Sequence, residues 1–552
     1  GMLAILFDKN TRFGDLRKKL KKLKDKKEQA KKVKLTAIFV LLFGLSGFAQ
    51  HQHQKPTERQ MDSIIHKYKV SDAHAAKFGK IVIQDAGGRM KPINTFSSEL
   101  LRKVSKSDIY KDMNADQVFI SITQLPEVWY NVPVIYLKRG NDSLRSITGL
   151  VKDAKYAALA DFFDNQGNYK LSGILEKAYR EEIPNQFDKD FMDIDKRINL
   201  LYSALSGQIL KVFPVPNDLN NKWVSFNEAA ENKNAELQSI KNILPYYMQA
   251  LEKASKDHDY TLANSLIEGL NNYQHKFGSK VMPSDDKVNA EILYNKYDIF
   301  KKLFSWYMYV GLLMFVFVIV KIFNSKKWIN IAVKSFTGII IVLFLLHTAG
   351  LIFRWYISGH APWSNAYESV IFVGWSTMLF GLLFGRKSDL TIASTAFVAS
   401  IILMVAHWNW TDPEIGNLVP VLDSYWLMIH VAVIVGSYGP FTLGMILGLV
   451  SLLLMIFTNN TNKEKMDINI KELTYINEMA LTVGLVMLTI GNFLGGQWAN
   501  ESWGRYWGWD PKETWALVSI MVYAFVIHMR FVPALRGRWI FNFFSVLAFA
   551  SI

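Results

Sequence analysis

The feature that most constrains this chain is the crowding of its long apolar runs into residues 301–552. Runs of about 20 apolar residues with few charges are typical of helices that span a membrane. Residues 50–300, in contrast, are polar and mixed. The pattern predicts a polytopic α-helical membrane protein with a mixed, mostly helical extracytoplasmic domain. The apolar runs lie at about 303–323, 332–353, 366–385, 390–406, 426–457, 475–495, 511–531 and 539–552.

Every second connection between these runs is basic. Because cytoplasmic loops of membrane proteins carry an excess of Lys and Arg, we assign the basic connections to the cytoplasm. The connections at 354–365, 407–425 and 496–510 are then expected on the outer side. The basic residues that decide this are Lys321, Lys326, Lys327, Lys334, Arg386, Lys387, Lys463, Lys465, Lys471, Arg530, Arg536 and Arg538.

The N-terminal segment carries much of the net charge of +15, in a basic run from Lys9 to Lys34. An apolar stretch, Leu35–Ala49, follows directly. Basic residues beside a membrane segment mark its cytoplasmic side, so this charge does not indicate nucleic-acid binding. We interpret 1–34 as a cytoplasmic segment, 35–49 as a short anchor helix or a signal-like segment, and 50–300 as one extracytoplasmic domain. Both interpretations of 35–49 send the domain outside.

The chain contains no cysteine. It therefore has no disulfide, no thiol nucleophile and no cysteine-based metal site. It also lacks a C-x-x-C-H segment of its own to which heme could be attached covalently.

Within 50–300, short strands are predicted at Lys80–Gln84 and Val118–Ile122, with a turn at Asp85–Gly88. Helical periodicity occurs near 190–213, 226–256 and 260–276. We find no catalytic constellation in this domain. Its early histidines suggest a metal site, but exposed polar histidines are more often incidental; these are His51, His53, His66 and His74.

The most unusual segment of the membrane half runs from Trp503 to Trp515 and contains four tryptophans within thirteen residues. Its Asp510-Pro511-Lys512-Glu513 portion fits the start of a helix, with a capping aspartate, a proline at the first helical position and an acid placed for a capping box. The tryptophans need another explanation. An interfacial aromatic belt is one interpretation, although a belt places fewer tryptophans at one helix end.

The alternative is a platform for a flat, apolar, anionic ligand, and heme fits this description through its large π-face, two propionates and iron. The expected contacts are Trp503, Trp507, Trp509 and Trp515, with Asp510 holding the loop and Arg505 or Lys512 meeting carboxylates. Heme iron also requires axial ligands, which directs attention to the histidines of this half.

Histidines in membrane segments are functional candidates by default. His430 lies near the expected outer end of its run, whereas His528 lies eighteen residues after Asp510, or about 27 Å along a helix. They therefore belong to opposite faces and predict two separate iron-binding sites. His360, in an outward loop, is either a structural or a functional residue, and Glu368 is either its partner or faces a cavity. We interpret His347 and His407 as structural or interfacial.

The segment Trp503–Trp515 resembles the tryptophan-rich "WWD" signature of heme-handling proteins, in the form carried by the System II cytochrome c synthases of the CcsA/ResC family. The segments Ser358–Ser369 and Asp423–His430 resemble the same family, in the same order, so the resemblance covers about 300–552. Residues 1–300, including Gly87–Pro92, are similar to the end of a CcsB/ResB-like half in fused synthases of the Bacteroidetes type.

The resemblance implies cytochrome c biogenesis at the inner membrane. Heme b is transported from the cytoplasm and presented on the periplasmic tryptophan-rich segment, 497–515. It is then joined to the C-x-x-C-H cysteines of apocytochrome c, as part of a holocytochrome c synthase. His430 matches an outer heme ligand and His528 a membrane heme ligand. The implied partners are heme, apocytochrome c, thiol-reducing proteins and a CcsB/ResB half where it is not fused; nucleic acid is not among them.

The last apolar run stops after fourteen residues at Ile552, which suggests that the sequence is cut inside a helix. The resemblance places a second outer histidine after that helix, and the other membrane histidine before this chain begins. Two alternatives to the synthase remain. One is a System I heme-delivery protein, which carries a related tryptophan-rich segment, and the other is a transporter of a different ligand.

Overall fold

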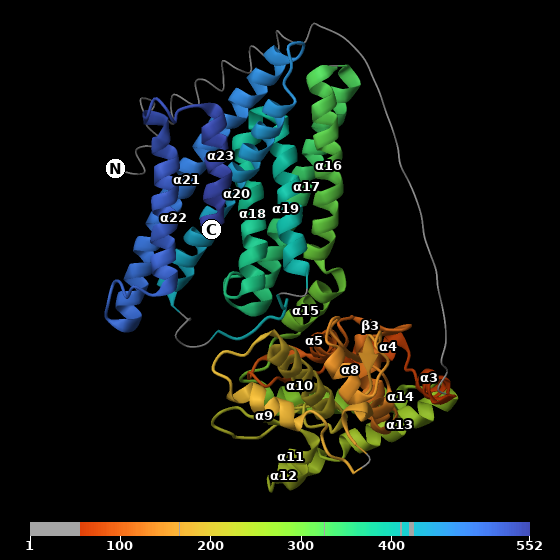
Figure 1. The fold of residues 1–552 in the computed structure, drawn as a ribbon. Coiled ribbons are helices and arrows are strands. Elements are labelled where there is room, and N and C mark those ends of the chain that lie inside the picture. The colour runs from red at the N-terminus through yellow and green to blue at the C-terminus, as the bar shows by residue number, and fades with distance from the viewer. Residues whose placement is uncertain (1–55, 165, 325, 409–410, 419–423) are drawn as a thin grey trace. The chain divides into compact units, whose positions relative to one another are not determined.

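The computed structural model describes residues 56–552 apart from 165, 325, 409–410 and 419–423 (Figure 1). The segments 1–34 and 35–49 therefore lie outside the described residues, as do His51 and His53. The described chain divides into two compact units, residues 56–296 and 297–552.

The first unit, the domain unit, is mostly helical, and its strands form two-stranded antiparallel pairs. Its helices are α3 (Pro56–Lys67), α4 (Asp72–Phe78), α5 (Ile93–Ser105), α6 (Ala115–Gln124), α7 (Pro126–Asn131), α8 (Asp142–Thr148), η2 (Leu159–Phe162), α9 (Ser172–Arg180), α10 (Gln186–Leu205), α11 (Phe226–Glu231), α12 (Ala235–Ile240), α13 (Ile243–Asp257), α14 (Thr261–Gly278) and α15 (Asp285–Tyr297). The pairs join β1 (Val82–Gln84) to β2 (Met90–Pro92), β3 (Ile109–Tyr110) to β4 (Met113–Asn114), β5 (Ile135–Tyr136) to β6 (Tyr156–Ala157), and β7 (Phe213–Pro214) to β8 (Trp223–Val224).

The predicted turn at Asp85–Gly88 is confirmed. It joins β1 to β2, with the Gly88 N–H donating to the Asp85 carbonyl at 3.0 Å. Gly88 has φ +80°, a left-handed conformation that glycine adopts without steric cost.

The strand predicted at Val118–Ile122 is wrong, because these residues belong to helix α6. Asn114 and Gln117 form a capping box that starts this helix. Every residue from Ala115 to Ile122 is buried. The segment therefore lacks the exposed polar face whose helical spacing would identify it as a helix in the sequence. A short, fully buried helix of this kind reads as a strand in the sequence.

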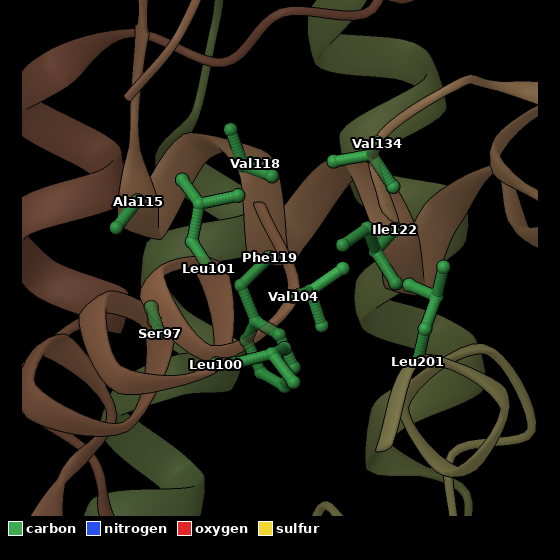
Figure 2. Close-up of a pocket in the computed structure, with 10 residues that line it drawn as sticks. All are labelled: Ser97, Leu100, Leu101, Val104, Ala115, Val118, Phe119, Ile122, Val134 and Leu201. Atoms are coloured by element: carbon green, nitrogen blue, oxygen red, sulfur yellow. The ribbon is translucent and has the colours of Figure 1, made fainter. Parts of the chain in front are cut away.

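The hydrophobic core of the domain unit lies where α5, α6 and α10 meet. Figure 2 shows a small cavity there, lined by nine residues from these helices and by Val134. Its one polar lining residue, Ser97, already donates to the Ile93 carbonyl at 2.7 Å. With no free polar group directed into it, the cavity is a feature of core packing.

The second unit, the membrane unit, is an all-helical bundle (Figure 1). In the described part of the chain, seven helices are long and apolar enough to cross a membrane, and one shorter apolar helix follows. The prediction of a polytopic α-helical membrane protein is confirmed. The helices are α16 (Ile299–Phe323), α17 (Lys327–Ser358), α18 (Ala366–Phe384), η3 (Gly385–Lys387), α19 (Asp389–His407), α20 (Tyr425–Ile456), α21 (Lys463–Trp503), α22 (Pro511–His528), η5 (Met529–Phe531), α23 (Arg538–Ala548) and η6 (Phe549–Ser551).

Helices α20 and α21 form the most extensive contact of the bundle. Glycines let their backbones approach closely, as is common between membrane helices. A Cβ on Gly484 would lie 2.8 Å from the Phe441 ring, and one on Gly491 would lie 2.6 Å from Ile434. Larger side chains at these positions would force the helices apart.

Ion pairs connect helices near the basic links. Lys321 at the end of α16 pairs with Asp389 at the start of α19, at 2.5 Å. Arg538 of α23 pairs with Asp467 of α21 at 2.6 Å, and Arg530 pairs with the buried Glu478 at 3.0 Å. These contacts gather the basic residues at the helix ends opposite the tryptophan-rich segment.

Helix α21 is longer than its apolar run predicts. Its 41 residues extend over about 60 Å, twice the thickness of the hydrocarbon core. The expected loop at 496–510 is therefore a loop only at 504–510, and the tryptophan-rich segment 497–515 includes the last turns of α21 and the first turn of α22. The longest helix of the bundle thus carries two of its tryptophans.

Candidate functional site

Tryptophan side chains cover the end of the bundle where α21 leads into α22. We call Trp498, Trp503, Trp507, Trp509 and Trp515 the tryptophan surface. Of these, Trp503, Trp509 and Trp515 are 49%, 71% and 56% exposed. The rings of Trp498 and Trp503 lie 4.7 Å apart, and those of Trp507 and Trp509 lie 5.7 Å apart. Three of the five rings thus lie largely outside the packed core, which makes the tryptophan surface a candidate binding site.

The loop 504–510 is held at both ends. Gly504 ends α21 in the left-handed conformation, with φ +70°. Asp510 caps α22, since its Oδ1 accepts hydrogen bonds from the N–H groups of Lys512 and Glu513 at 2.8 and 2.9 Å. The predicted helix start is confirmed, except that Glu513 accepts from the Gly508 N–H at 2.7 Å instead of from Asp510. The acidic residues thus fix the loop.

Trp509 adopts a left-handed backbone conformation, with φ +57°. This conformation is uncommon for a bulky residue and costs on the order of 1 kcal/mol. The indole is the most exposed of the tryptophan surface, so burial does not offset the cost. Strain retained by an exposed side chain is typical of a position selected for binding.

His430 lies beside the tryptophan surface. It is in the second turn of α20, and its ring centre lies 5.4 Å from that of Trp498. Its Nδ1 lies 2.9 Å from the Trp426 carbonyl oxygen. A carbonyl only accepts, so Nδ1 carries the proton, and Nε2 of the neutral ring keeps its lone pair. This tautomer allows the imidazole to bind a metal through Nε2.

Two adjacent glycines bring His430 close to the loop. A Cβ on Gly495 would lie 3.4 Å from the His430 ring, and one on Gly496 would lie 3.1 Å from the Tyr506 carbonyl oxygen. The absence of side chains here lets α21 pass between the imidazole and the loop. His430 and the loop therefore both lie against the end of α21, which makes them candidates for one site.

Polar groups in this site remain available to a ligand. Among the described residues, the indole Nε1 atoms of Trp498 and Trp507 are buried without a hydrogen-bond partner. Unsatisfied buried donors are uncommon in folded proteins and often mark a site for a ligand or water. Arg505 is exposed, with its guanidinium 5.9 Å from the Trp503 ring. Donors, a cation and an imidazole around aromatic rings suit an anionic porphyrin.

His528 is the last residue of α22, at the opposite end of that helix from Asp510. It repeats the arrangement of His430: its Nδ1 donates to the Ala524 carbonyl at 2.7 Å, which leaves the Nε2 lone pair free. It is exposed. A helix of this length separates its ends by about 27 Å, so His430 and His528 cannot ligate the same iron.

His360 is not available as a ligand. Its Nδ1 lies 3.2 Å from the Ala361 carbonyl oxygen and its Nε2 lies 3.2 Å from that of Gly416. Each nitrogen faces a backbone carbonyl, an imidazole with one N–H donates to one of the two, and the ring is 7% exposed. Of the two interpretations left open by the sequence, the structure supports the structural one.

Glu368 pairs with Arg354 rather than with His360. The Arg354 Nε–Glu368 Oε1 distance is 2.8 Å, and both side chains are fully buried. The sequence analysis did not pair these residues. The sequence nevertheless contains a signal for this ion pair. An arginine precedes and a glutamate follows one short loop between two apolar runs, and charged residues at such positions in a membrane protein need a partner.

Trp498 lies within the predicted segment 497–515 but was not among the expected heme contacts. In the structure α21 continues to Trp503, and the Trp498 ring lies 4.7 Å from the Trp503 ring and 5.4 Å from the His430 ring. Residues five apart on a helix do not share a face, so these contacts could not be read from the spacing.

Fold and site together define the class: a multi-pass helical membrane protein with an aromatic surface beside an imidazole that is free to bind a metal. Comparison with known proteins gives the particular family. Residues 363–552 match the family model described as "Cytochrome C assembly protein". The cytochrome c biogenesis protein CcsA of Prochlorococcus marinus strain MIT 9301 is 35% identical over 260 residues, which cover 42% of this chain and 83% of CcsA. The chain belongs to the CcsA family of cytochrome c biogenesis proteins.

A second relative extends the similarity. Protein NrfI of Wolinella succinogenes is 38% identical over 479 residues, or 86% of this chain and 52% of NrfI. The chain thus spans about half the length of NrfI. An alignment of 479 residues is longer than the whole membrane unit, so it also includes much of the domain unit.

Proposed function

We propose that this protein presents heme on the tryptophan surface for covalent attachment to apocytochrome c. The observation that carries the proposal is the free Nε2 of His430 beside exposed tryptophan rings. His430 supplies an axial imidazole, while Trp503, Trp507, Trp509 and Trp515 pack on or around the porphyrin. Arg505, which is exposed beside Trp503, meets the propionates.

His528 supplies an imidazole for heme at the other face. The proposal rests on its repeated Nδ1 arrangement and on its place among basic residues at the far end of α22. Those basic residues mark the cytoplasmic side by the usual charge rule, so the tryptophan surface faces the periplasm. Heme b then passes from the cytoplasmic side to the periplasmic side of the inner membrane.

Thioether formation needs no redox change. Each cysteine thiol of the apocytochrome C-x-x-C-H segment adds to a heme vinyl group: the sulfur bonds to one vinyl carbon, and the proton goes to the other. The chemistry belongs to the heme and the thiols, and the protein supplies position. Since this chain has no cysteine, thiol-reducing partners are needed to keep the cytochrome cysteines reduced.

We assign the domain unit to the CcsB/ResB-like part of a fused synthase. The assignment rests on the resemblance of residues 1–300, including Gly87–Pro92, and the alignment with NrfI shows only that the similarity extends beyond the membrane unit. The domain then lies on the same side as the tryptophan surface, where apocytochrome c arrives.

The test is the yield of heme covalently bound to a c-type cytochrome in cells, with substitutions made in the native gene. We expect His430→Ala to abolish covalent heme and His66→Ala, at an exposed position of α3, to leave it unchanged. Normal cytochrome c in cells carrying His430→Ala, at an unchanged level of the protein, would overturn the proposal.

A further inference from the structure

A buried ion pair organises the corner between α17 and α18. Arg354 near the end of α17 donates from Nε to Glu368 Oε1 at 2.8 Å, and Glu368 Oε2 accepts from the N–H and hydroxyl of Ser364 at 2.9 and 2.7 Å. The guanidinium also lies over the Tyr367 ring at 5.1 Å. Because the pair is fully buried and bonded on both sides, this corner is rigid.

The same corner holds the segment 413–416, which lies between α19 and α20. Arg354 donates from Nη1 to the Pro413 carbonyl at 3.0 Å and from Nη2 to the Glu414 carbonyl at 3.1 Å. His360 contacts the Gly416 carbonyl at 3.2 Å, and Asn365 donates to that of Glu414 at 3.4 Å. Three side chains therefore fix a stretch of irregular backbone through its carbonyls.

Trp363 connects the corner directly to α20. Its indole Nε1–H donates to the Met428 carbonyl at 3.0 Å. Met428 is in the first turn of α20, two residues before His430. Trp363 is itself held in a cluster of aromatic rings, since its ring centre lies 4.8 Å from that of Phe372 and 5.9 Å from that of Trp355.

The start of α20 depends on these contacts, because it has little support of its own. Among the described residues, the N-cap Ser424 makes no capping hydrogen bond with its side chain. An uncapped first turn frays unless tertiary contacts hold it. The imidazole of His430 is anchored in that turn, through its hydrogen bond to the Trp426 carbonyl.

We infer that the α17–α18 corner (Arg354, His360, Trp363 and Glu368) is a clamp that positions His430 for heme. This inference rests on the proposed function of His430. The clamp residues are positioning residues. Trp363 acts through the backbone of α20, and the other three hold the corner and the segment 413–416 beside it. The structure thereby gives His360 a role other than ligation.

Trp363→Phe is the sharpest probe of the clamp, because it keeps an aromatic ring and removes the hydrogen bond to α20. Trp375→Phe is its matched control. The Trp375 indole lies in the same aromatic cluster and donates to Thr348 Oγ1 at 2.8 Å, so it joins α18 to α17 instead of to α20. Each substitution thus removes one indole hydrogen bond from the same cluster.

The measurement is a hemin titration of the purified full chain in detergent, in a His528→Ala background so that the outer site is read alone. We expect Trp363→Phe to weaken hemin binding roughly three- to tenfold, the usual effect of one lost hydrogen bond. Added imidazole should restore the absorption spectrum of hemin bound to Trp363→Phe. Free imidazole can bind the iron in place of a His430 side chain that is no longer well positioned. Trp375→Phe should bind hemin as the background protein does.

Equal binding by Trp363→Phe and Trp375→Phe would overturn the clamp. A second pair, His360→Gln and His360→Ala, tests it independently: the glutamine amide can still donate to the Gly416 carbonyl, so only the alanine variant should lose affinity. His430→Ala separates the two proposals. If it keeps hemin affinity, the proposed function fails; if it loses affinity while all clamp variants match the background, only the clamp fails.

Discussion

The imidazole of His430 and the indole of Trp498 lie with their ring centres 5.4 Å apart, although one belongs to α20 and the other to the end of α21. Gly495, one turn before Trp498, leaves the space for this approach. The contact joins the candidate iron ligand to the tryptophan surface, and the tests of the site follow from it.

Trp509→Gly should separate binding from stability. Glycine adopts the left-handed conformation without strain, which offsets the loss of the ring contact with Trp507. We expect the free energy of unfolding in detergent to change by no more than about 1 kcal/mol, so the thermal unfolding midpoint shifts little. The affinity for hemin should fall. If the variant unfolds far earlier than the parent protein, the ring serves mainly stability.

Asp510 should tolerate asparagine but not alanine. Asparagine caps a helix about as well as aspartate, whereas alanine costs about 1 kcal/mol at this position. We therefore expect Asp510→Asn to retain hemin binding and Asp510→Ala to lower both binding and the unfolding midpoint. Loss of binding by Asp510→Asn with an unchanged midpoint would show that the negative charge itself is required.

The Arg354–Glu368 pair should behave as a buried ion pair. Removing one partner leaves an uncompensated buried charge, so Arg354→Met should cost about 3–5 kcal/mol in stability. The double variant Arg354→Met with Glu368→Met should recover part of this loss, but not the contacts to Pro413 and Glu414. Thermal unfolding of the three proteins tests this; a double variant less stable than the single one would contradict it.

His74 should make the domain unit sensitive to acid. It is buried, with Nδ1 at 2.9 Å from Asn264 Oδ1 and Nε2 at 2.8 Å from the Tyr247 hydroxyl. The sequence analysis took it as exposed; the structure corrects this. Burial lowers the pKa of His74 below its ordinary value of 6.5, because the charged ring would lose water.

The sign follows from proton binding. Below about pH 6.5 the unfolded chain binds a proton at His74 that the folded domain does not bind. The contribution of His74 to the free energy of unfolding is therefore fully present above that pH and is lost as the pH falls. Hydrogen exchange of α4 and α14 in the full chain, compared at pH 7.5 and 5.5 after correction for intrinsic rates, measures the effect. His74→Gln should remove most of the pH dependence, and His66→Gln should leave it intact.

The sequence predicted the membrane half well because its signals are local. Apolar length defines a membrane helix, and the Asp510–Glu513 pattern defines a helix start. The prediction of cytochrome c biogenesis is confirmed at the level of the family.

What the sequence could not predict depends on tertiary contacts. The extent of α21 to Trp503 is not visible in hydropathy, because its last turns leave the apolar run, and so the contact between Trp498 and His430 was not predicted. The buried helix α6 has no polar face and reads as a strand. The partners of His360 and Glu368 lie 56 and 14 residues away. The roles of the individual heme contacts stay predictions.

The most direct test of the central claim is the absorption spectrum of the reduced full chain loaded with heme, in a His528→Ala background. We predict the sharp visible bands of imidazole-ligated heme. These bands should disappear in the His430→Ala/His528→Ala double variant and return when imidazole is added. Unchanged bands in the double variant would contradict the assignment of His430 as the ligand beside the tryptophan surface.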